Sequence, residues 1–327
     1  MRHKMYKQLL AWICAFILIT LRVSIHLPLL HYGQATVVIE IPQHTSAAQL
    51  VRILATKHLI ISPNLWLCVI RIGGFASKLR AGYYQIQPGD TGISLLRKIV
   101  HGTVLVKTFK IIEGTTSIEV MHNLAVAPYL NYNQVAVDAA SSDIAKNHQS
   151  LEGLLLADTY FYDAGSAAAD ILLRAHVKLQ QNLHYYWNTR SDNLPYKNPY
   201  ELLTAASILE KETASAVERK IIAGIIVNRL NLHMPLQMDP TVIYPLHLKQ
   251  HNFYKLHHRD LTIDSPYNTY LHRGLPPTPI ALIGQSALEA ASHPLQVDYL
   301  YFYANGDGSH QFSRTYTEQK QAIKNRG

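Results

Sequence analysis

Between residues 35 and 125 the pattern of apolar and polar positions repeats three times. Each copy has a short run rich in β-branched or aromatic residues, then a turn, then Ser or Thr opening a stretch with helical spacing. The copies read TVVIEIPQHTSAAQLVRILA, AGYYQIQPGDTGISLLRKIV and FKIIEGTTSIEVMHNLA. Between the first two, Ser62-Pro63 predicts a helix start and Gly73-Gly74 its end. The pattern predicts a small α+β module over residues 34–104, followed by a βα segment and a polar linker over 105–150.

A second, more buried pattern occupies residues 198–244. Asn198-Pro199 predicts a helix start, and apolar or small residues then follow at helical spacing, at Leu202, Leu203, Ala206 and Leu209. Glu210 shares the face of Leu203 and Ser207, whereas Glu212 is two positions further on. We therefore expect the Glu210 side chain to turn inward and the Glu212 side chain to face water.

A further helix is predicted from about Ala216 to Leu230. Its expected inward stripe is Val217, Ile221, Gly224, Ile225 and Asn228. Burying a carboxylate and an amide on neighbouring helices is costly unless the two groups have partners or a task. Two interpretations stay open for Glu210: a hydrogen-bonded group that fixes helix packing, and a catalytic acid.

The remaining pattern predicts an α+β C-terminal part. Asp239-Pro240 predicts a capped short turn through Tyr244, and residues 264–281 predict an extended, proline-rich loop. A helix is expected over about 284–292. YLYFYA and HQFS then predict two strands joined by Asn305-Gly306-Asp307-Gly308, and a capping-box pattern from Thr315 to Glu318 predicts the last helix.

Residues 1–33 predict a membrane anchor. Arg2, Lys4 and Lys7 precede the apolar run LLAWICAFILIT, and no A-x-A cleavage site follows. We expect one uncleaved helix of ~20 residues, with Arg22 near its far end and the N-terminus in the cytoplasm. A cleaved signal peptide is the less favoured alternative.

The composition of the chain limits the classes of partner and cofactor that we expect. The chain has 327 residues and a net charge of +8, which suits an anionic membrane, an anionic polymer or nucleic acid. Its Lys and Arg are scattered and no nucleic-acid motif occurs, so we expect no nucleic-acid partner. Cys14 falls in the apolar run, so a disulfide with Cys68 is not expected. His247, His251, His257 and His258 have no carboxylate at metal-ligand spacing, so we expect neither a metal nor another cofactor.

ASILEKET, ERKIIAGIIVNRL, LQMDPTVIY, DSPYNTY and GLPPTPIA occur in this order along the chain. Together they resemble the catalytic domain of the endolytic murein transglycosylases, the YceG-like family. The resemblance implies a LysM-like module over 34–104 and a YceG-like catalytic domain over 105–327. It also implies a single-pass protein of the bacterial inner (plasma) membrane, with the catalytic domain in the periplasm. Peptidoglycan glycan strands would be the substrate, and peptidoglycan synthases (penicillin-binding proteins) would be partners.

The implied reaction cleaves the MurNAc–GlcNAc bond and leaves 1,6-anhydroMurNAc ends, which would terminate nascent strands. Ordinary glycosidases need two carboxylates, whereas here the 6-hydroxyl of the sugar attacks, so one acid–base group suffices. Glu210 is the predicted catalytic residue, and Glu210→Gln is expected to abolish turnover while Glu212→Gln is tolerated. The predicted substrate-binding residues are Asn228, Gln237, Asp239, Tyr267, Asn268, Glu152, His310 and Ser313.

Some positions depart from the family's pattern. They are Thr115, Leu156, Ala157, Met238 and Gln319, where the family usually has other residues. No role is predicted for them. Asp239 is also explained as a helix cap, and Asp158 is better explained as a turn residue than as part of the site.

Two other functions stay open. One is a non-catalytic peptidoglycan-binding scaffold that tethers wall-synthesis proteins, which the intact Glu210 disfavours. The other is a cytosolic small-molecule lyase of a cofactor pathway, which the predicted anchor and the absence of a Gly-rich phosphate loop disfavour. For the LysM-like module, glycan binding and a simple spacer role are equally compatible with the residues.

Overall fold

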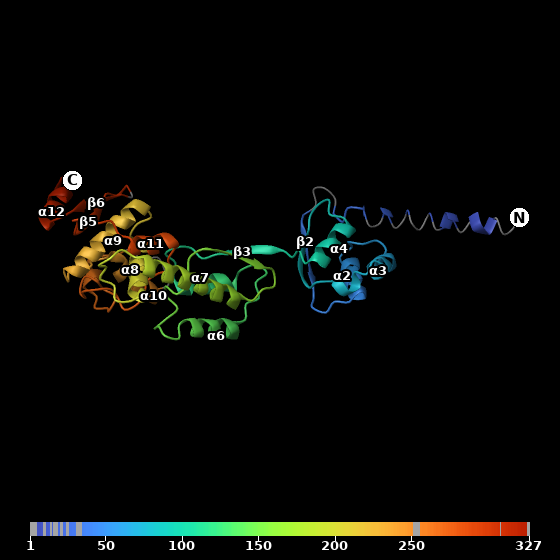
Figure 1. Ribbon diagram of the computed structural model, residues 1–327, viewed down its shortest axis with the longest axis horizontal. Coiled ribbons are helices and arrows are strands. Elements are labelled where there is room, and N and C mark those ends of the chain that lie inside the picture. Colours follow the sequence, from blue (N-terminus) through green and yellow to red (C-terminus); the bar gives the residue numbers. More distant parts are fainter. Residues whose placement is uncertain are drawn as a thin grey trace. The chain divides into compact units, whose positions relative to one another are not determined.

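The computed structural model describes residues 35–250, 256–307 and 309–325, and within the first thirty residues 5–8, 11–13, 15, 19, 22–23 and 26–30. The chain forms two compact units. Unit 1 comprises Met1–Lys107 with Phe161–Ser166, and unit 2 comprises Thr108–Tyr160 with Ala167–Gly327 (Figure 1). None of the helices in the described part of the chain has the length and hydropathy to cross a membrane. Most of the anchor predicted over residues 1–33 lies outside the described residues.

Unit 1 packs helices against a two-stranded antiparallel sheet. Strand β1 (Val37–Ile41) pairs with β2 (Gly82–Ile86), and α2 (Ala47–Thr56), α3 (Pro63–Ile72) and α4 (Gly92–His101) follow the predicted order, with a 3₁₀ turn η1 (Ala76–Lys78) after α3. One face of the sheet is apolar and joins a core with the helices, through Ile39, Ile41, Tyr84, Ile86, Leu50, Trp66, Leu95 and Ile99. The predicted strands and helices of this unit are confirmed.

Capping explains why three strand–helix copies fold alike. Ser46, Thr91 and Thr116 each accept a hydrogen bond from the backbone N–H three residues later, and the side chain of that residue bonds back. This reciprocal pair satisfies two backbone donors that a helix start leaves open. The third copy consists of β3 (Val106–Lys110) and α5 (Ser117–Ala125). β3 pairs with β4 (Thr159–Asp163), and the division between the units falls within both strands.

Unit 2 is built around α8 (Pro199–Glu212). Every residue from Leu202 to Leu209 is buried, because α7 (Ala168–Thr189), α9 (Ala216–Asn231), α10 (Asp239–Gln250) and α11 (Gln285–Ser292) all pack against it. A further helix, α6 (Gln134–Ile144), packs on α7. A helix surrounded in this way has no solvent-exposed face. The spacing of apolar residues along it therefore does not predict which side chains are buried and which are exposed.

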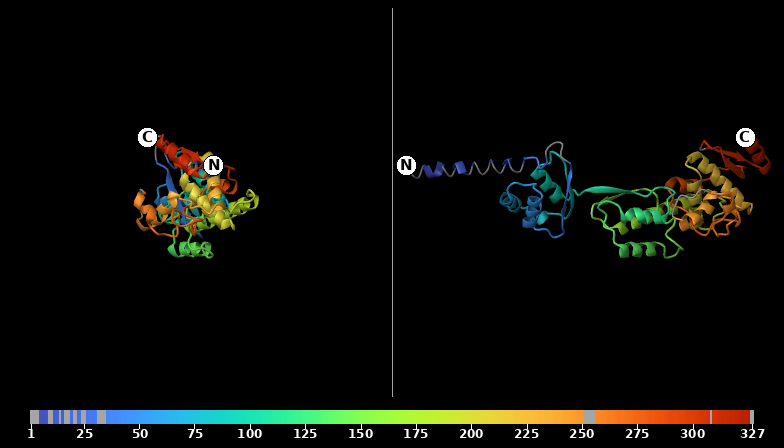
Figure 2. Two further views of the ribbon diagram at one scale, coloured as in Figure 1. Left: turned by 90° about the vertical axis from the view of Figure 1, so that its left-hand side faces the viewer. Right: turned by 180° about the vertical axis from the view of Figure 1, so that it is seen from behind.

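The C-terminal part forms a hairpin and a helix. Strand β5 (Tyr301–Ala304) pairs antiparallel with β6 (His310–Ser313), and α12 (Tyr316–Lys324) follows with Thr315 as its cap. Figures 1 and 2 show these elements in red beside α9. The predicted hairpin and last helix are confirmed, although Gly308 of the turn lies outside the described residues.

Two sequence predictions about helices are wrong. Val217 is 69% exposed, whereas the buried face of α9 includes Arg219 and Arg229. These two arginines are buried because backbone carbonyls and, for Arg219, a carboxylate satisfy their guanidinium groups. The turn predicted at Asp239 is a helix that continues to Gln250, with Pro245 inside it. A single proline removes one backbone donor but does not end this helix.

Candidate active site

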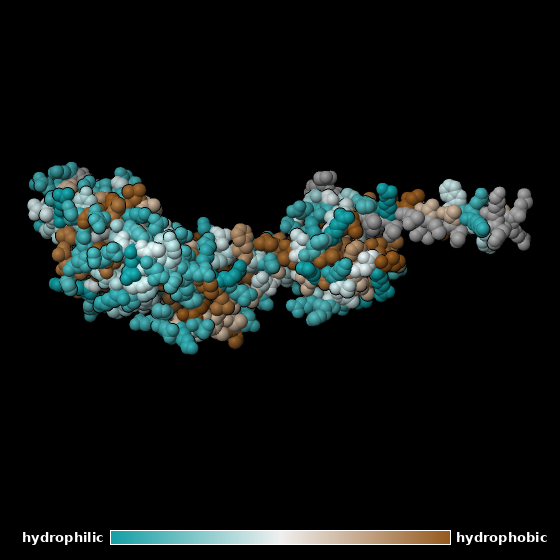
Figure 3. Space-filling view, in the orientation of Figure 1, coloured by the Kyte–Doolittle hydropathy of each residue, from teal (hydrophilic) through white to brown (hydrophobic). Residues whose placement is uncertain are grey.

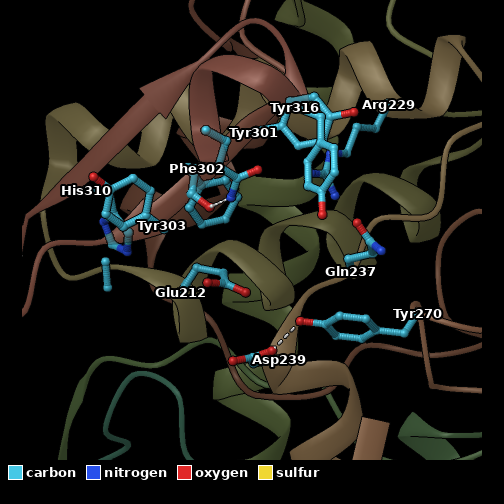
Figure 4. A pocket seen from close by; sticks show the side chains of 12 residues that line it. Glu212, Arg229, Gln237, Asp239, Tyr270, Tyr301, Phe302, Tyr303, His310 and Tyr316 are labelled. Carbon is cyan, nitrogen blue, oxygen red and sulfur yellow. Dashed lines mark hydrogen bonds between the residues drawn. The ribbon is translucent and has the colours of Figure 1, made fainter. Parts of the chain in front are cut away.

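The candidate active site is a cavity of about 430 Å³ in unit 2. The end of α8, α9, the start of α10, the loop after η2 (His258–Thr262), the C-terminal hairpin and α12 all contribute to its walls. Its lining residues are Glu212, Arg229, Gln237, Asp239, Tyr270, Tyr301, Phe302, Tyr303, Ala304, His310, Tyr316 and Gln319. Aromatic side chains of the hairpin and α12 form one wall, with Arg229 beside them, and Gln237, Asp239 and Tyr270 lie opposite (Figure 4). Ring faces beside amide and carboxyl groups are suited to binding an amphipathic sugar ring.

Glu212 lies in the middle of this cavity, between Asp239 and the aromatic wall (Figure 4). It is partly buried, and its carboxyl accepts no hydrogen bond from any other residue that the structure describes. The pKa of Glu212 is raised to about 8. Burial is the largest cause, the negative charge of Asp239 acts in the same direction, and the positive charge of Arg229 opposes the shift. The carboxyl is therefore mostly protonated at neutral pH and can donate a proton.

Asp239 is held by Tyr270. The Tyr270 hydroxyl donates to Asp239 Oδ1 at 2.5 Å. Burial is the main cause of the raised pKa of this phenol, and the hydrogen bond to Asp239 is the second cause. Asn268 sets the position of that tyrosine, since its Oδ1 accepts the Tyr270 N–H at 2.9 Å. Asn268 itself is buried and its amide group donates to two backbone carbonyls. It therefore supports the cavity from behind rather than lining it.

Gln237 lines the cavity in a backbone conformation that non-glycine residues rarely adopt, with φ of 52°. The adjacent backbone is tied to the neighbouring loop, because the Gln237 N–H donates to Thr269 O at 3.1 Å and the Met238 N–H to Thr269 Oγ1 at 3.0 Å. These bonds fix a left-handed residue immediately before Asp239. Such strain at a cavity wall is typical of functional sites.

His310 lines the cavity and is clamped by Glu218 from α9. Its ring Nδ1 lies 2.7 Å from Glu218 Oε2, and its backbone N–H donates to Glu218 Oε1 at 2.9 Å. Burial alone would raise the pKa of Glu218, but its bonds to His310 outweigh burial and lower it. An ionised carboxylate only accepts hydrogen bonds, so Nδ1 carries the proton. In the neutral form of the ring, Nε2 is then the nitrogen that can accept a hydrogen bond.

Arg229 joins two walls of the cavity. Its guanidinium donates to Leu300 O at 2.6 Å and to Leu236 O at 2.6 Å, and it lies 5.3 Å from the centre of the Tyr301 ring. Burial lowers its pKa. Because its donors are directed at backbone carbonyls, Arg229 fixes the segment before Asp239 and the start of the hairpin relative to α9.

Glu210 has different surroundings. Its side chain is only 2% exposed, Oε1 lies 3.0 Å from Arg219 Nη2, and Oε2 accepts the Gly284 N–H at 2.8 Å. Arg219 also donates to Thr213 O and Ser286 Oγ, so the pair ties the end of α8 to α9 and α11. Burial raises the pKa of Glu210, while the bond from Gly284 and the charge of Arg219 oppose that shift.

The predicted inward orientation of Glu210 is therefore confirmed, whereas the predicted water-facing orientation of Glu212 is wrong. Glu212, expected to face water, lines the cavity, and Glu210 is enclosed in an ion pair outside it. The helical period failed because α8 is buried on all sides, so both glutamates can point into the protein.

The structure gathers three of the predicted binding residues, Gln237, Asp239 and His310, around Glu212. It places the other five away from the cavity lining. Asn228 donates to Val297 O and Tyr299 O, and the Tyr267 hydroxyl bonds with Thr278. Ser313 is buried opposite Tyr301 in the hairpin, where its carbonyl accepts the Leu300 N–H. For these residues, the contacts describe a structural role.

Glu152 is also outside the cavity. It is buried and accepts hydrogen bonds from the backbone N–H and the hydroxyl of Ser117, each at 3.2 Å. Burial raises its pKa to about 7, and the bonds from Ser117 oppose that shift. Its contacts join α5 to the loop before β4, so the binding role predicted for Glu152 has no support from its position.

Several cavity residues were not predicted. They are Glu212 itself, Arg229, Tyr270, the aromatic residues of the hairpin and α12, and Gln319, to which no role was assigned. Tyr270 and Glu212 fall inside the motifs DSPYNTY and ASILEKET, so the motifs marked the right segments. No group of three metal-ligating side chains occurs among the residues that the structure describes, which leave out His251.

Comparisons with known proteins point to one family. The sequence profile of the YceG-like family matches residues 39–325. A Bacillus subtilis (strain 168) protein named endolytic murein transglycosylase is 31% identical over 310 residues, which cover 89% of this chain and 84% of that one. A protein of the same name from Streptococcus pneumoniae is 36% identical over 158 residues, 47% of this chain and 28% of its own. The crystal structure of a putative yceG-like protein from Listeria monocytogenes aligns with a TM-score of 0.55 at 30% identity, covering 89% of this chain and all of that one.

Proposed function

This chain belongs to the YceG-like family, and we propose that it is an endolytic murein transglycosylase in which Glu212 is the acid–base catalyst. The observation that carries the choice of Glu212 is its carboxyl group, which lies in the cavity without a protein partner among the described residues and has a pKa raised to about 8. A protonated carboxyl at neutral pH is what the departure of a sugar oxygen requires.

The proposed reaction has two steps. In the first, the bond between C1 of MurNAc and the bridging oxygen breaks, and the Glu212 proton goes to that oxygen. In the second, the 6-hydroxyl of the same MurNAc bonds to C1 and its proton returns to the Glu212 carboxylate. The product carries a 1,6-anhydro end and no water is consumed, so one carboxyl serves both steps.

Asp239 would serve the same reaction without transferring a proton. Its negative charge contributes to the raised pKa of Glu212. A carboxylate held in place by Tyr270 would also stabilise positive charge at C1 as the bond breaks. Gln237 and Nε2 of His310 would bind hydroxyl or N-acetyl groups, with ring faces from the hairpin beneath the sugar.

A non-catalytic scaffold is less well supported. A scaffold has no need for an unpaired carboxyl with a raised pKa in the middle of a cavity, because burying such a group is costly. Among the described residues, none donates a hydrogen bond to the Glu212 carboxyl. A substrate that donates one would explain why the cavity leaves this group unpaired. The names of the similar proteins point the same way.

We also propose that the chain is a single-pass protein of the inner membrane with a cytoplasmic N-terminus, a LysM-like unit 1 and peptidoglycan synthases as partners. The basic flank of Arg2, Lys4 and Lys7 supports the topology. Protease added to spheroplasts should degrade unit 2. Protection of unit 2 in intact spheroplasts would contradict this topology.

Mass spectrometry of products from purified glycan strands in ¹⁸O-labelled water tests the activity. We expect anhydro-ended fragments without ¹⁸O from the wild-type chain, and from Glu212→Gln the same fragments at a rate lower by about 10²–10⁴-fold. Glu289→Gln is the matched control, because Glu289 is half-exposed and pairs with Lys220 on the surface. Reducing ends that carry ¹⁸O would instead identify a hydrolase.

A further inference from the structure

The outer side of α3 is an apolar surface. Trp66 and Ile70 point into the core of unit 1, Cys68 and Ile72 are exposed on the outer side of the helix, and Leu65 lies half-buried at the edge of that side. Cys68 is exposed, Ile72 is 88% exposed, and Ile61, just before the helix, is 83% exposed. We call Ile61, Leu65, Cys68 and Ile72 the α3 face. Figure 3 shows apolar side chains gathered over this helix.

An isolated exposed isoleucine would need no explanation, but the α3 face is a row. Leu65, Cys68 and Ile72 follow the i, i+3, i+7 spacing of one helix stripe, and Ile61 is exposed just before the N-cap Ser62. A soluble surface rarely keeps aliphatic side chains together in this way, and such patches mark interaction sites.

Charge indicates the partner. Residues 35–107 contain only two acidic residues, Glu40 and Asp90, against eight basic ones: Arg52, Lys57, Arg71, Lys78, Arg80, Arg97, Lys98 and Lys107. Asp90 is already paired with Lys98 at 2.6 Å. Arg71 is on α3 itself, Lys57 precedes the helix and Lys78 follows it. The apolar row therefore lies within a strongly cationic unit.

We propose that the α3 face docks unit 1 on the surface of an anionic lipid bilayer. Aliphatic side chains would enter the acyl boundary while the flanking Lys and Arg contact lipid phosphates. A glycan or a soluble anionic polymer would use the cations but would gain little from Ile61 and Ile72. Leu29 and Leu30, which follow the apolar run in the sequence, are part of unit 1: the Leu29 N–H donates to Asp90 O and Leu30 is buried in the unit's core.

Cys68 provides a probe in the middle of the face. In the full-length chain, Cys14→Ser leaves Cys68 as the site for a polarity-sensitive fluorophore. The protein is incorporated into phosphatidylcholine vesicles with or without phosphatidylglycerol. We expect a blue-shifted emission and quenching by lipid-attached quenchers only when phosphatidylglycerol is present, with the effect weakened by salt. The same label at Val135→Cys, in a chain with both native cysteines replaced, should stay in water, because Val135 is an exposed residue of α6 in unit 2.

A double variant supplies the second measurement. Ile61→Glu with Ile72→Glu should abolish quenching by lipid and leave the rate on soluble glycan strands unchanged, whereas Val135→Glu should change neither. Fluorescence measures docking and product formation measures the transglycosylase activity. Either proposal can therefore be contradicted while the other is supported. A Cys68 label that stays accessible to aqueous iodide with both lipids would overturn the proposal. So would a label shielded from iodide but not quenched by lipid, because protein would then cover the face.

Discussion

Glu210 and Glu212 lie two residues apart at the end of α8, yet their carboxyl groups have opposite surroundings. Both oxygens of Glu210 are bonded, one to Arg219 and one to the Gly284 N–H, and the side chain is almost completely enclosed. Glu212 lies in an open cavity, and among the described residues none donates a hydrogen bond to its carboxyl. Burial raises the pKa of both groups. At Glu210 a hydrogen bond from Gly284 and the charge of Arg219 oppose that shift, whereas at Glu212 only the charge of Arg229 opposes it and Asp239 adds to it.

This difference in surroundings indicates that Glu210 has a structural role and Glu212 a chemical role, although the two residues lie within one helical turn. The Glu210–Arg219 pair joins α8, α9 and α11 and so holds the end of α8 in place. That fixed end positions Glu212 against Asp239. A catalytic acid has to exchange its proton, and a fully bonded carboxylate exchanges it poorly. We therefore expect Glu210 variants to affect folding and Glu212 variants to affect turnover.

Glu212→Gln should have the largest effect on activity. Glutamine has the same shape but neither donates an acidic proton nor takes one back, so the rate should fall by about 10²–10⁴-fold. Anhydro-ended products measured by mass spectrometry give the rate, and circular dichroism checks the fold. If Glu212→Gln turns over at the wild-type rate, Glu212 is not the catalyst and Asp239 becomes the next candidate.

Glu210→Gln should act on stability instead. Removing one partner of a buried ion pair leaves the other charge unpaired, which typically costs roughly 3–5 kcal/mol in the free energy of unfolding. Denaturant titration measures the loss, and we expect turnover per folded molecule to stay within a few-fold of the wild type. Unchanged stability with lost turnover would reverse the two roles, as the sequence alone predicts.

Local signals predicted most elements of this fold. The caps at Ser46, Thr91 and Thr315 and the Ser62-Pro63 start gave correct helix beginnings, because capping depends on neighbours in the chain. In the site, Gln237, Asp239 and His310 were predicted as individual residues, whereas Glu212 was predicted only by its segment. Which glutamate faces the cavity depends on five helices packing together, and no local period carries that information.

The buried arginines of α9 illustrate the same limit. Arg219 and Arg229 look like solvent-facing charges in the sequence, so they were left out of the inward stripe. Gly224 and Ile225 of that stripe are buried as predicted, whereas Val217 is exposed. Their partners come from distant segments, Glu210 and Ser286 for one and Leu300 for the other. A charged residue has a low cost of burial only when such partners exist, and they become visible only in the folded chain.

The pH dependence should separate the two glutamates further. Glu212 acts as an acid only when protonated, so the rate should fall as pH rises through about 8.

The raised pKa of Glu212 also means that the folded state binds this proton more tightly than the unfolded chain does. Stability from Glu212 is thus complete below its ordinary pKa of 4.5 and is lost as pH rises toward about 8. Glu212→Gln should be more stable than the wild type at pH 9, by roughly 1–3 kcal/mol after allowance for solvent access.

Asp239→Asn should shift that pH profile. It removes a negative charge that raises the pKa of Glu212, so the alkaline fall in rate should begin at lower pH. The shift should be partial, because burial is the larger cause. Tyr270→Phe is the control: it removes the hydrogen bond to Asp239 but keeps the charge, so its profile should not move to lower pH. A common shift in both variants would mean that a rearranged cavity, and not charge, sets the profile.

The smallest effect should come from His310, at the edge of the cavity. In His310→Asn the amide can still donate to Glu218 in place of Nδ1, but the acceptor at Nε2 is gone. If Nε2 accepts a hydrogen bond from the glycan, KM should rise by roughly two- to tenfold with little change in kcat, which corresponds to one lost hydrogen bond.

Glu218→Gln removes the ionised acceptor that fixes the proton on Nδ1, so ¹⁵N spectra of the His310 ring should show the other tautomer gaining population. A structural role for the Glu218–His310 pair would lower stability in both variants and leave KM unchanged. That outcome would confine substrate contacts to the walls around Glu212.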